Sequence, residues 1–228
     1  MLYAIVKWML RWLLPALFRI RWLGFENIPF QGPVLLAANH LSLLDPLAVA
    51  AGASRPLHFM AKGELFRIPL LGGLIRRLNA HPVEREGADA RALRQALGLL
   101  RGGSALLLFP EGTRGAEGTL RQGRPGSGML AALSEAPVVP VYIQGSGRAL
   151  PRGAKRPRMV RVTVAYGPPL RFPRTRGRER YQEVSNEIMA AIGRLKADVE
   201  GAAAPGATPS ATTNHADRTA RGPLPVGQ

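Results

Sequence analysis

Hydrophobic residues between positions 24 and 200 fall into short dense runs, separated by longer segments with helical spacing. Apolar runs of about four to eight residues are typical of strands buried in a sheet. Such runs are found at 33–38, 57–60, 104–109, 138–143 and 159–166. The last run alternates, with valine or tyrosine at every second position, so one side of that strand is expected to face a core.

Helical periodicity marks segments between and after these runs. Residues 46–53 follow Asp45, which suits a helix start. Residues 90–100 and 177–199 carry apolar side chains at helical spacing, and the first of these two segments is followed by Gly102-Gly103, a usual helix stop. Strands that alternate with helices predict an α/β fold. We therefore expect a single domain over residues 24–200, with a central, mostly parallel or mixed sheet flanked by helices.

Residues 1–23 are almost entirely apolar, but basic residues recur among them. Lys7, Arg11, Arg19 and Arg21 interrupt each apolar run before it reaches the roughly 18 residues typical of a spanning helix. Because charges are spread through the segment and no small-residue cleavage site follows it, a signal peptide is also disfavoured.

An interfacial helix fits this segment better than a span or a leader. Lys7 and Arg11 share a helical face, and the three tryptophans of the chain, all before residue 24, suit the headgroup level of a bilayer. We expect an N-terminal interfacial membrane helix, kinked near its middle by Pro15, whose cations reach lipid phosphates. An amphipathic helix docked on the domain's own core is the alternative.

Residues 201–228 have no hydrophobic periodicity and are rich in Ala, Gly, Thr and Pro. Such a composition is typical of disorder. The predicted organisation is therefore a membrane-associating helix at 1–23, one folded domain at 24–200 and a disordered tail at 201–228.

Charge and composition limit the classes of binding partner that the chain is expected to have. The 228-residue chain has 31 Lys and Arg against 15 Asp and Glu, a formal net charge of +16, so it is expected to bind something anionic. Segment 148–180 holds 11 of these cations against Glu179, yet its prolines and few aromatic residues disfavour a nucleic-acid interface. A loop-borne basic patch beside a membrane is favoured instead. The sequence contains no cysteine, which excludes disulfides and thiol nucleophiles.

Among the four histidines, His40 has the setting of a general base. It follows the apolar run VLLAA as Asn39-His40, and Asp45 comes five residues later at the start of a predicted helix. A carboxylate returned by such a turn can fix the imidazole tautomer and stabilise the imidazolium. Asp45-Pro46 is also a good helix start, so a capping role for Asp45 stays open, and the two roles are compatible.

A second polar cluster, FPEGTR at 109–114, directly follows a predicted strand. Glu111, Thr113 and Arg114 are expected at the carboxyl end of that strand, where ligands bind in open α/β sheets. Arg114 can contact a phosphate in bidentate fashion, and Glu111 can hold a hydroxyl or that guanidinium. A surface turn with an exposed ion pair is the alternative.

A third, weaker cluster consists of Lys62 and Arg85, for which ordinary solvated charge is the alternative. The sequence has no nucleophile elbow, no Gly-rich phosphate loop and no set of residues with metal-ligand spacing. A base with phosphate-binding cations and no protein nucleophile suggests direct group transfer to a substrate hydroxyl.

Four motifs, in order, resemble the signatures of the glycerolipid acyltransferases. NHLSLLD at 39–45 is similar to the N-H-x4-D motif, FPEGTR at 109–114 resembles the second signature, Arg85 in PVER matches the arginine between them, and VVPV at 138–141 matches the apolar-Pro block. The motifs span about residues 24–170, and the chain, including its short N-terminal segment, is similar to the bacterial 1-acyl-sn-glycerol-3-phosphate acyltransferases. Gly115 departs from the pattern, because many members have Ser there, which puts one acceptor contact in doubt.

This resemblance implies an acyltransferase of phospholipid biosynthesis. It would transfer a fatty acyl group from acyl-CoA or acyl-acyl-carrier-protein to the sn-2 hydroxyl of lysophosphatidic acid, forming phosphatidic acid. His40 would take the hydroxyl proton and Asp45 would orient His40. The residues implied in substrate binding are Arg85, Glu111, Gly112, Thr113 and Arg114, with Lys62 as a further phosphate contact and Pro140 on the acyl-donor side.

The resemblance implies neither a metal nor a redox cofactor. It implies a peripheral or monotopic enzyme at the cytoplasmic face of the membrane, whose partners are lysophosphatidic acid, the acyl donor, the membrane surface and, for one donor, the acyl-carrier protein. Two alternatives stay open: an acyltransferase acting on another lysolipid, and a non-catalytic basic module that binds membranes or nucleic acid.

Overall fold

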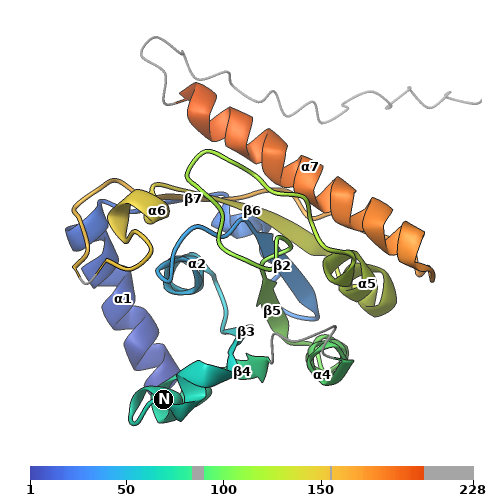
Figure 1. Ribbon diagram of the computed structural model, residues 1–228, viewed down its shortest axis with the longest axis horizontal. Helices are drawn as coiled ribbons and strands as arrows, with labels where there is room; N and C mark the ends of the chain where they lie inside the picture. Colours follow the sequence, from blue (N-terminus) through green and yellow to red (C-terminus); the bar gives the residue numbers. More distant parts are fainter. Residues whose placement is uncertain (84–89, 155, 203–228) are drawn as a thin grey trace, which may run out of the picture.

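A mixed sheet with helices on both faces forms the centre of the molecule (Figure 1). The computed structural model describes residues 1–83, 90–154 and 156–202. Within these ranges seven strands form one sheet in the order β1-β7-β6-β2-β5-β3-β4. The strands are β1 (Arg21–Leu23), β2 (Val34–Ala38), β3 (Leu57–Lys62), β4 (Ala80–Val83), β5 (Ala105–Leu108), β6 (Val138–Gln144) and β7 (Thr163–Tyr166).

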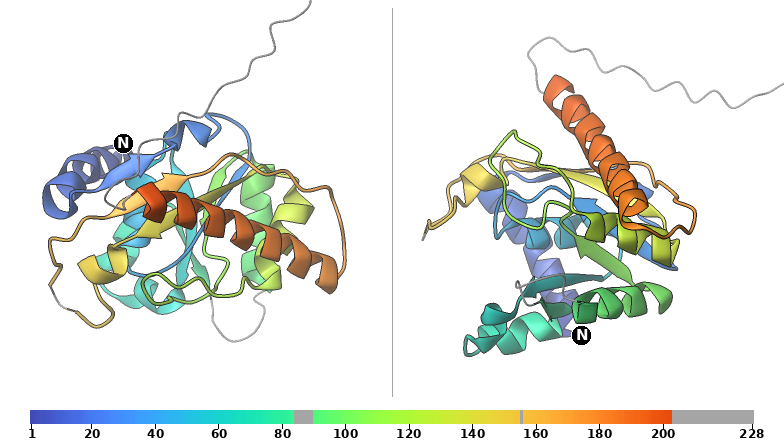
Figure 2. Two further views of the ribbon diagram at one scale, coloured as in Figure 1. Left: turned by 90° about the horizontal axis from the view of Figure 1, so that it is seen from above. Right: turned by 45° about the vertical axis from the view of Figure 1, so that its right-hand side comes forward.

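The helices form an outer layer on each side of this sheet (Figures 1 and 2). They are α1 (Leu2–Phe18), α2 (Asp45–Gly52), α3 (Leu71–Arg77), α4 (Ala90–Arg101), α5 (Pro125–Ser134), α6 (Ser146–Ala149) and α7 (Arg178–Ala202), with the short 3-10 helices η1 (Phe25–Asn27) and η2 (Gly63–Arg67). The expected α/β domain with a mixed sheet is confirmed.

Two hydrophobic cores follow from the alternation of side chains along the strands. Val34, Leu36 and Ala38 of β2 face α1 and α2, whereas Leu35 and Ala37 face the layer of α4, α5 and α7. All five are fully buried, as expected for a strand covered by helices on both faces. This explains why the central strands are continuous apolar runs in the sequence.

The direction of the strands determines where polar loops gather. β2, β3, β5 and β6 are connected by parallel pairings, while β6 and β7 pair antiparallel. The carboxyl ends of these four parallel strands therefore lie at one edge of the sheet, which we call the carboxyl edge. In open α/β sheets, ligands bind at this edge.

Helix α1 docks on the core, which corrects part of the sequence-based expectation. Leu14 and Phe18 are buried, and the ammonium of Lys7 donates a 2.5 Å hydrogen bond to the carbonyl of Ala53 beyond α2. Lys7 thus contacts the protein's own backbone, whereas a contact with lipid phosphate was expected. Its pKa is lowered by burial and by the nearby Arg11.

Trp22 also turns inward, contrary to the expected headgroup position. Its indole Nε1 donates a 2.9 Å hydrogen bond to the carbonyl of Ala48, and its ring packs so closely on Gly52 that a Cβ there would lie 2.1 Å away. Pro15 lies in the last turn of α1 instead of its middle. No helix among the described residues is long and apolar enough to cross a membrane.

The opposite face of α1 remains apolar and exposed. Trp8 and Trp12 are 67% and 69% exposed, and Ile5, Met9 and Leu13 are exposed beside them. At the other end of the chain, α7 continues to Ala202, two residues beyond the predicted domain boundary. Residues 203–228, which were expected to form a disordered tail, lie outside the described residues.

Candidate active site

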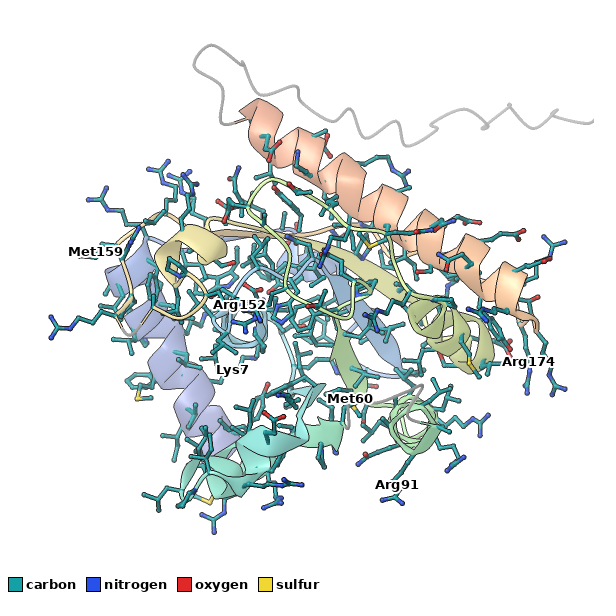
Figure 3. All side chains as sticks on the ribbon, viewed as in Figure 1. Lys7, Met60, Arg91, Arg152, Met159 and Arg174 are labelled. Atoms are coloured by element: carbon teal, nitrogen blue, oxygen red, sulfur yellow. The ribbon has the colours of Figure 1, made fainter. Side chains whose placement is uncertain are left out.

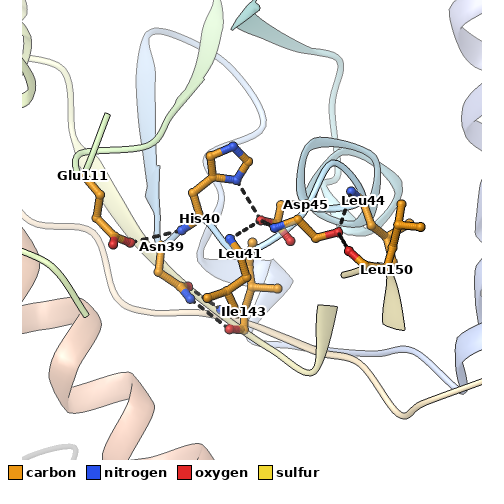
Figure 4. A network of polar contacts seen from close by, with 9 residues as sticks. Asn39, His40, Leu41, Leu44, Asp45, Glu111, Ile143 and Leu150 are labelled. Atoms are coloured by element: carbon orange, nitrogen blue, oxygen red, sulfur yellow. Dashed lines mark hydrogen bonds and ion pairs between the residues drawn. The ribbon is translucent and has the colours of Figure 1, made fainter. Parts of the chain in front are cut away.

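His40 and Asp45 form a hydrogen-bonded pair at the carboxyl edge (Figure 4). Nδ1 of His40 lies 2.8 Å from Oδ2 of Asp45; the His40 side chain is 18% exposed, whereas that of Asp45 is fully buried. The preceding Asn39 fixes the end of β2, because its side-chain amide exchanges two hydrogen bonds with the backbone of Ile143 in β6, at 2.9 and 2.7 Å. The turn between β2 and α2 thus brings the pair together.

Asp45 serves the local fold as well as the imidazole. Its Oδ2 also accepts hydrogen bonds from the backbone N–H groups of Leu41, at 2.6 Å, and Ser42, at 2.8 Å. Since a carboxylate only accepts hydrogen bonds, Nδ1 of His40 carries a proton, and in the neutral imidazole Nε2 therefore has the lone pair. No described residue hydrogen-bonds to Nε2. The geometry therefore leaves a ring nitrogen free to act as a general base.

Phe109 stacks on the imidazole, a contact that the sequence analysis missed. The ring centroids of His40 and Phe109 are 4.0 Å apart and the planes are inclined by 19°. Phe109 follows β5, the neighbour of β2 in the sheet, so two residues far apart in sequence meet at the carboxyl edge. The available sequence signal was that His40 and Phe109 each come at the end of an apolar run that predicts a buried strand.

Glu111 does not have the environment expected of a substrate ligand. It is only 3% exposed; its Oε1 accepts the backbone N–H of His40 at 3.1 Å and its Oε2 accepts that of Arg121 at 3.2 Å. Gly115 completes the connection, because its N–H donates to the carbonyl of His40 at 2.7 Å. Glu111 thus ties the loop after β5 to the backbone of His40 and does not hold Arg114.

Burial dominates the electrostatics of Glu111. Desolvation raises the pKa of its carboxyl group, while the hydrogen bonds from His40 and Arg121 act in the opposite direction. Burial of this carboxyl group therefore costs solvation free energy, and its hydrogen bonds to backbone N–H groups indicate that it positions the loop.

The rest of the 109–114 motif lies at the same edge. Gly112 has φ 67°, and a Cβ there would lie 2.7 Å from Nε of Arg124, so this glycine allows both the turn and the close approach of that guanidinium. Thr113 and Arg114 are half-buried. Within the described ranges no carboxylate pairs with Arg114, so its guanidinium is free to contact a ligand. The position of Arg124 beside the motif was missed by sequence reasoning.

The structure does not bring every predicted site residue to the edge. Lys62 ends β3 there and forms an ion pair with Glu64. Pro140 lies inside β6, opposite Ala37 of β2. Its ring packs so closely on Gly167 that a Cβ at that position would lie 3.0 Å from it. Arg85 lies outside the described residues.

A buried carboxylate that orients an imidazole base, with no side-chain hydroxyl bonded to that imidazole in the described residues, is suited to transfer of a group onto a substrate hydroxyl. The family model of acyltransferases matches residues 19–144, more than half of the chain. The protein therefore belongs to the acyltransferase family.

Relatives of known name agree with this assignment. The chain is 30% identical over 135 residues to the chloroplastic 1-acyl-sn-glycerol-3-phosphate acyltransferase BAT2 of Brassica napus, and 31% identical over 128 residues to the 1-acyl-sn-glycerol-3-phosphate acyltransferase of Bacillus subtilis. These matches cover 58% and 55% of this chain but only 39% and 63% of the relatives, less than two thirds of their length.

A solved structure is similar over most of both chains. The crystal structure of the 1-acyl-sn-glycerophosphate acyltransferase PlsC from Thermotoga maritima superposes with a TM-score of 0.70 at 29% identity. The superposition covers 86% of this chain and 80% of the Thermotoga chain. The similarity thus extends to the overall arrangement of the domain.

Proposed function

We propose that the protein transfers a fatty acyl group from a thioester donor, either acyl-CoA or acyl-acyl-carrier-protein, to the sn-2 hydroxyl of 1-acyl-sn-glycerol-3-phosphate, forming phosphatidic acid. The observation that carries this proposal is the 2.8 Å contact between His40 Nδ1 and Asp45 Oδ2. It leaves Nε2 of His40 able to accept the proton of an alcohol. The acyltransferase family and the names of the relatives support the choice of substrates.

The reaction needs one base and no covalent protein intermediate. Nε2 of His40 takes the hydroxyl proton as the oxygen attacks the thioester carbonyl, and the buried carboxylate of Asp45 stabilises the imidazolium that forms. As the carbon–sulfur bond breaks, the imidazolium returns this proton to the leaving sulfur. The products are an oxygen ester and a free thiol, and no metal or redox step is involved.

The phosphate of the acceptor requires cations near His40. Arg114 is the best placed of the described residues, because it follows β5 at the carboxyl edge and lacks a carboxylate partner there. A guanidinium can hold a phosphate through two parallel hydrogen bonds. Arg85 and Lys62 are proposed as further contacts, and Thr113 and Gly112 as parts of the same loop.

The location of the substrates favours a membrane surface. The acceptor is held in the bilayer by its acyl chain, whereas the donor is soluble. Helix α1 presents Trp8 and Trp12 to solvent, which suits insertion at the headgroup level. We propose a monotopic protein at the cytoplasmic face of the membrane, which receives its donor as CoA thioester or from the acidic carrier protein.

An acceptor panel tests the function directly. Purified protein is given one acyl-CoA and, in turn, lysophosphatidic acid, lysophosphatidylcholine and an acylated amino-acid lipid without a phosphate, and free thiol is measured. The proposal predicts release with lysophosphatidic acid above all others. Preference for another acceptor would identify a different lysolipid acyltransferase, and absence of release with any acceptor would favour the basic binding module.

The membrane assignment has its own test. A Trp8→Ser/Trp12→Ser variant is expected to sediment less with vesicles, because two exposed aromatic rings no longer enter the interface. Truncation of α1 is a poorer test, since Leu14 and Phe18 belong to the core. Unchanged sedimentation of the folded double variant would contradict the role of α1.

A further inference from the structure

A second group of exposed apolar side chains lies in the segment that joins η2 to α3. Leu70 is 93% exposed, Ile68 47% and Leu74 42%. Single exposed leucines are common on soluble proteins, but three large apolar side chains within seven residues form a patch. We call residues 68–74 the apolar tip.

The backbone around the tip is held firmly in place. A Cβ on Gly72 would lie 2.3 Å from the carbonyl oxygen of Phe66, so α3 folds directly back on η2. Phe66 is buried and anchors the segment. Leu70 has φ 64°, an unfavourable conformation for a leucine. A leucine held in such a conformation and displayed to solvent points to a function for the exposed side chain.

The apolar tip belongs to the carboxyl edge, where His40 lies. β3 ends at Lys62 and η2 begins at the next residue. Because β3 runs parallel to β5, and β5 parallel to β2, the segment leaves the sheet at the same edge as His40. α3 also approaches α1, since Leu78 at its end lines the same apolar crevice as Tyr3 and Val6.

The charges around the tip have one predominant sign. Arg67, Arg76 and Arg77 are exposed beside it, and the guanidinium of Arg76 lies 5.2 Å from the ring centre of Phe66. Glu64 is the acidic residue of η2 and α3. Apolar side chains surrounded by guanidinium groups match an anionic bilayer, with the apolar groups below the headgroups and the cations among the phosphates.

We infer that η2 and α3 form a second membrane-contacting element, which binds anionic bilayers together with α1 and turns the carboxyl edge toward the lipid. The inference rests on the proposed function only in that the acceptor is held in the bilayer. The binding itself is independent of turnover.

The absence of cysteine from the sequence makes a site-specific test possible. Leu70→Cys, Trp12→Cys and Phe30→Cys are each labelled with an environment-sensitive nitrobenzoxadiazole dye. Phe30 is the matched control, because it is 76% exposed but precedes the amino end of β2, at the opposite edge. With vesicles of phosphatidylglycerol and phosphatidylcholine, we expect a blue shift and quenching by spin-labelled lipid at positions 70 and 12, and neither at position 30.

A dye at position 70 that stays in water while the dye at position 12 enters lipid would overturn the inference. As a second arm, Leu70→Ser is expected to weaken vesicle binding about tenfold, since one leucine side chain is no longer buried, whereas Phe30→Ser leaves it unchanged. A Leu70→Ser protein that loses self-association but keeps vesicle binding would show instead that the tip binds a second copy. All readings are made without substrate, so an inactive protein tests the inference equally well.

Discussion

Asp45 and Glu111 approach His40 from different directions, one through its ring and the other through its backbone. Asp45 Oδ2 bonds Nδ1 of the imidazole, whereas Glu111 Oε1 bonds the main-chain N–H. The first contact sets the tautomer and the second sets the position of the residue. The two carboxylates are therefore expected to affect different kinetic quantities.

Glu111→Gln is predicted to lower kcat roughly tenfold with little change in KM for lysophosphatidic acid. The amide can accept only one of the two backbone N–H groups that the carboxylate binds, so the loop and His40 lose their fixed relation. Steady-state kinetics separate the roles. A raised KM with unchanged kcat would mean that Glu111 binds substrate after all.

The difference in stability between Glu111→Gln and the unsubstituted protein is predicted to depend on pH. Because burial raises the pKa of Glu111 in the folded protein, its contribution to stability falls as pH rises from about 4.5 through the raised pKa. The Tm of Glu111→Gln minus that of the unsubstituted protein should therefore increase as pH rises through this range. Thermal unfolding at a series of pH values measures this difference.

Arg114→Ala is predicted to raise KM for lysophosphatidic acid more than KM for the acyl donor, because the acceptor phosphate loses a charged partner. Arg85→Ala is expected to behave in the same way. Arg174→Ala is the control, since this exposed arginine lies away from the carboxyl edge (Figure 3). Equal loss with an acceptor that has no phosphate would indicate a structural role for Arg114.

Sequence reasoning located His40 and Asp45 because their pairing depends on a short local turn. It misplaced the contacts of Glu111 because its partners are backbone N–H groups of residues on other loops, which carry no side-chain signature. Trp22 was misjudged for a related reason: its ring is covered by Gly52, which is distant in sequence.

Helices and strands could be predicted from the sequence where their hydrophobic pattern is strong. β2, β3, β5 and β6 are apolar runs and were found within a few residues. β4 was missed because it has four residues, one of them proline, at an edge of the sheet. α5 was missed because its first four residues, Pro-Gly-Ser-Gly, conceal a helix whose remaining residues are mostly apolar.

Those two glycines provide a matched test of helix packing. A Cβ on Gly128 would lie 1.9 Å from the carbonyl oxygen of Tyr181 in α7, whereas nothing lies within 4 Å of a Cβ on Gly126. Gly128→Ala is predicted to destabilise the fold by about 1–3 kcal/mol, and Gly126→Ala to stabilise it by about 0.5–1 kcal/mol. Denaturant unfolding of both variants measures the difference, and equal effects would contradict the packing of α5 on α7.

Across the whole molecule, the basic residues of segment 148–180 separate into two groups that the linear sequence could not distinguish. Residues 150–154 and 156–162 follow β6 and α6 at the carboxyl edge, and the segment ends at α1, where the backbone N–H of Val162 donates a hydrogen bond to the carbonyl of Phe18. Residues 171–177 begin at the amino end of β6, because Leu170 bridges Val138. Met159 and Arg174 accordingly appear at opposite sides of the molecule (Figure 3).

This separation predicts unequal effects of charge reversal. Changing Arg152, Arg156 and Arg158 to Glu should weaken binding to anionic vesicles strongly, since each cation near such a surface contributes about 1 kcal/mol. The same change at Arg174, Arg176 and Arg178 should have a much smaller effect, although the sequence alone placed all six beside the membrane. Vesicle sedimentation at low and physiological salt compares them, and equal losses would contradict the separation.

We propose that His40 is the base that activates the acceptor hydroxyl. The most direct test is thiol release from acyl-CoA at saturating lysophosphatidic acid, measured for the unsubstituted protein and for His40→Ala, with circular dichroism and vesicle sedimentation to verify fold and binding. Turnover is expected to fall roughly 10²- to 10⁴-fold, while fold and vesicle binding are retained. Near-normal turnover by His40→Ala would contradict the proposal.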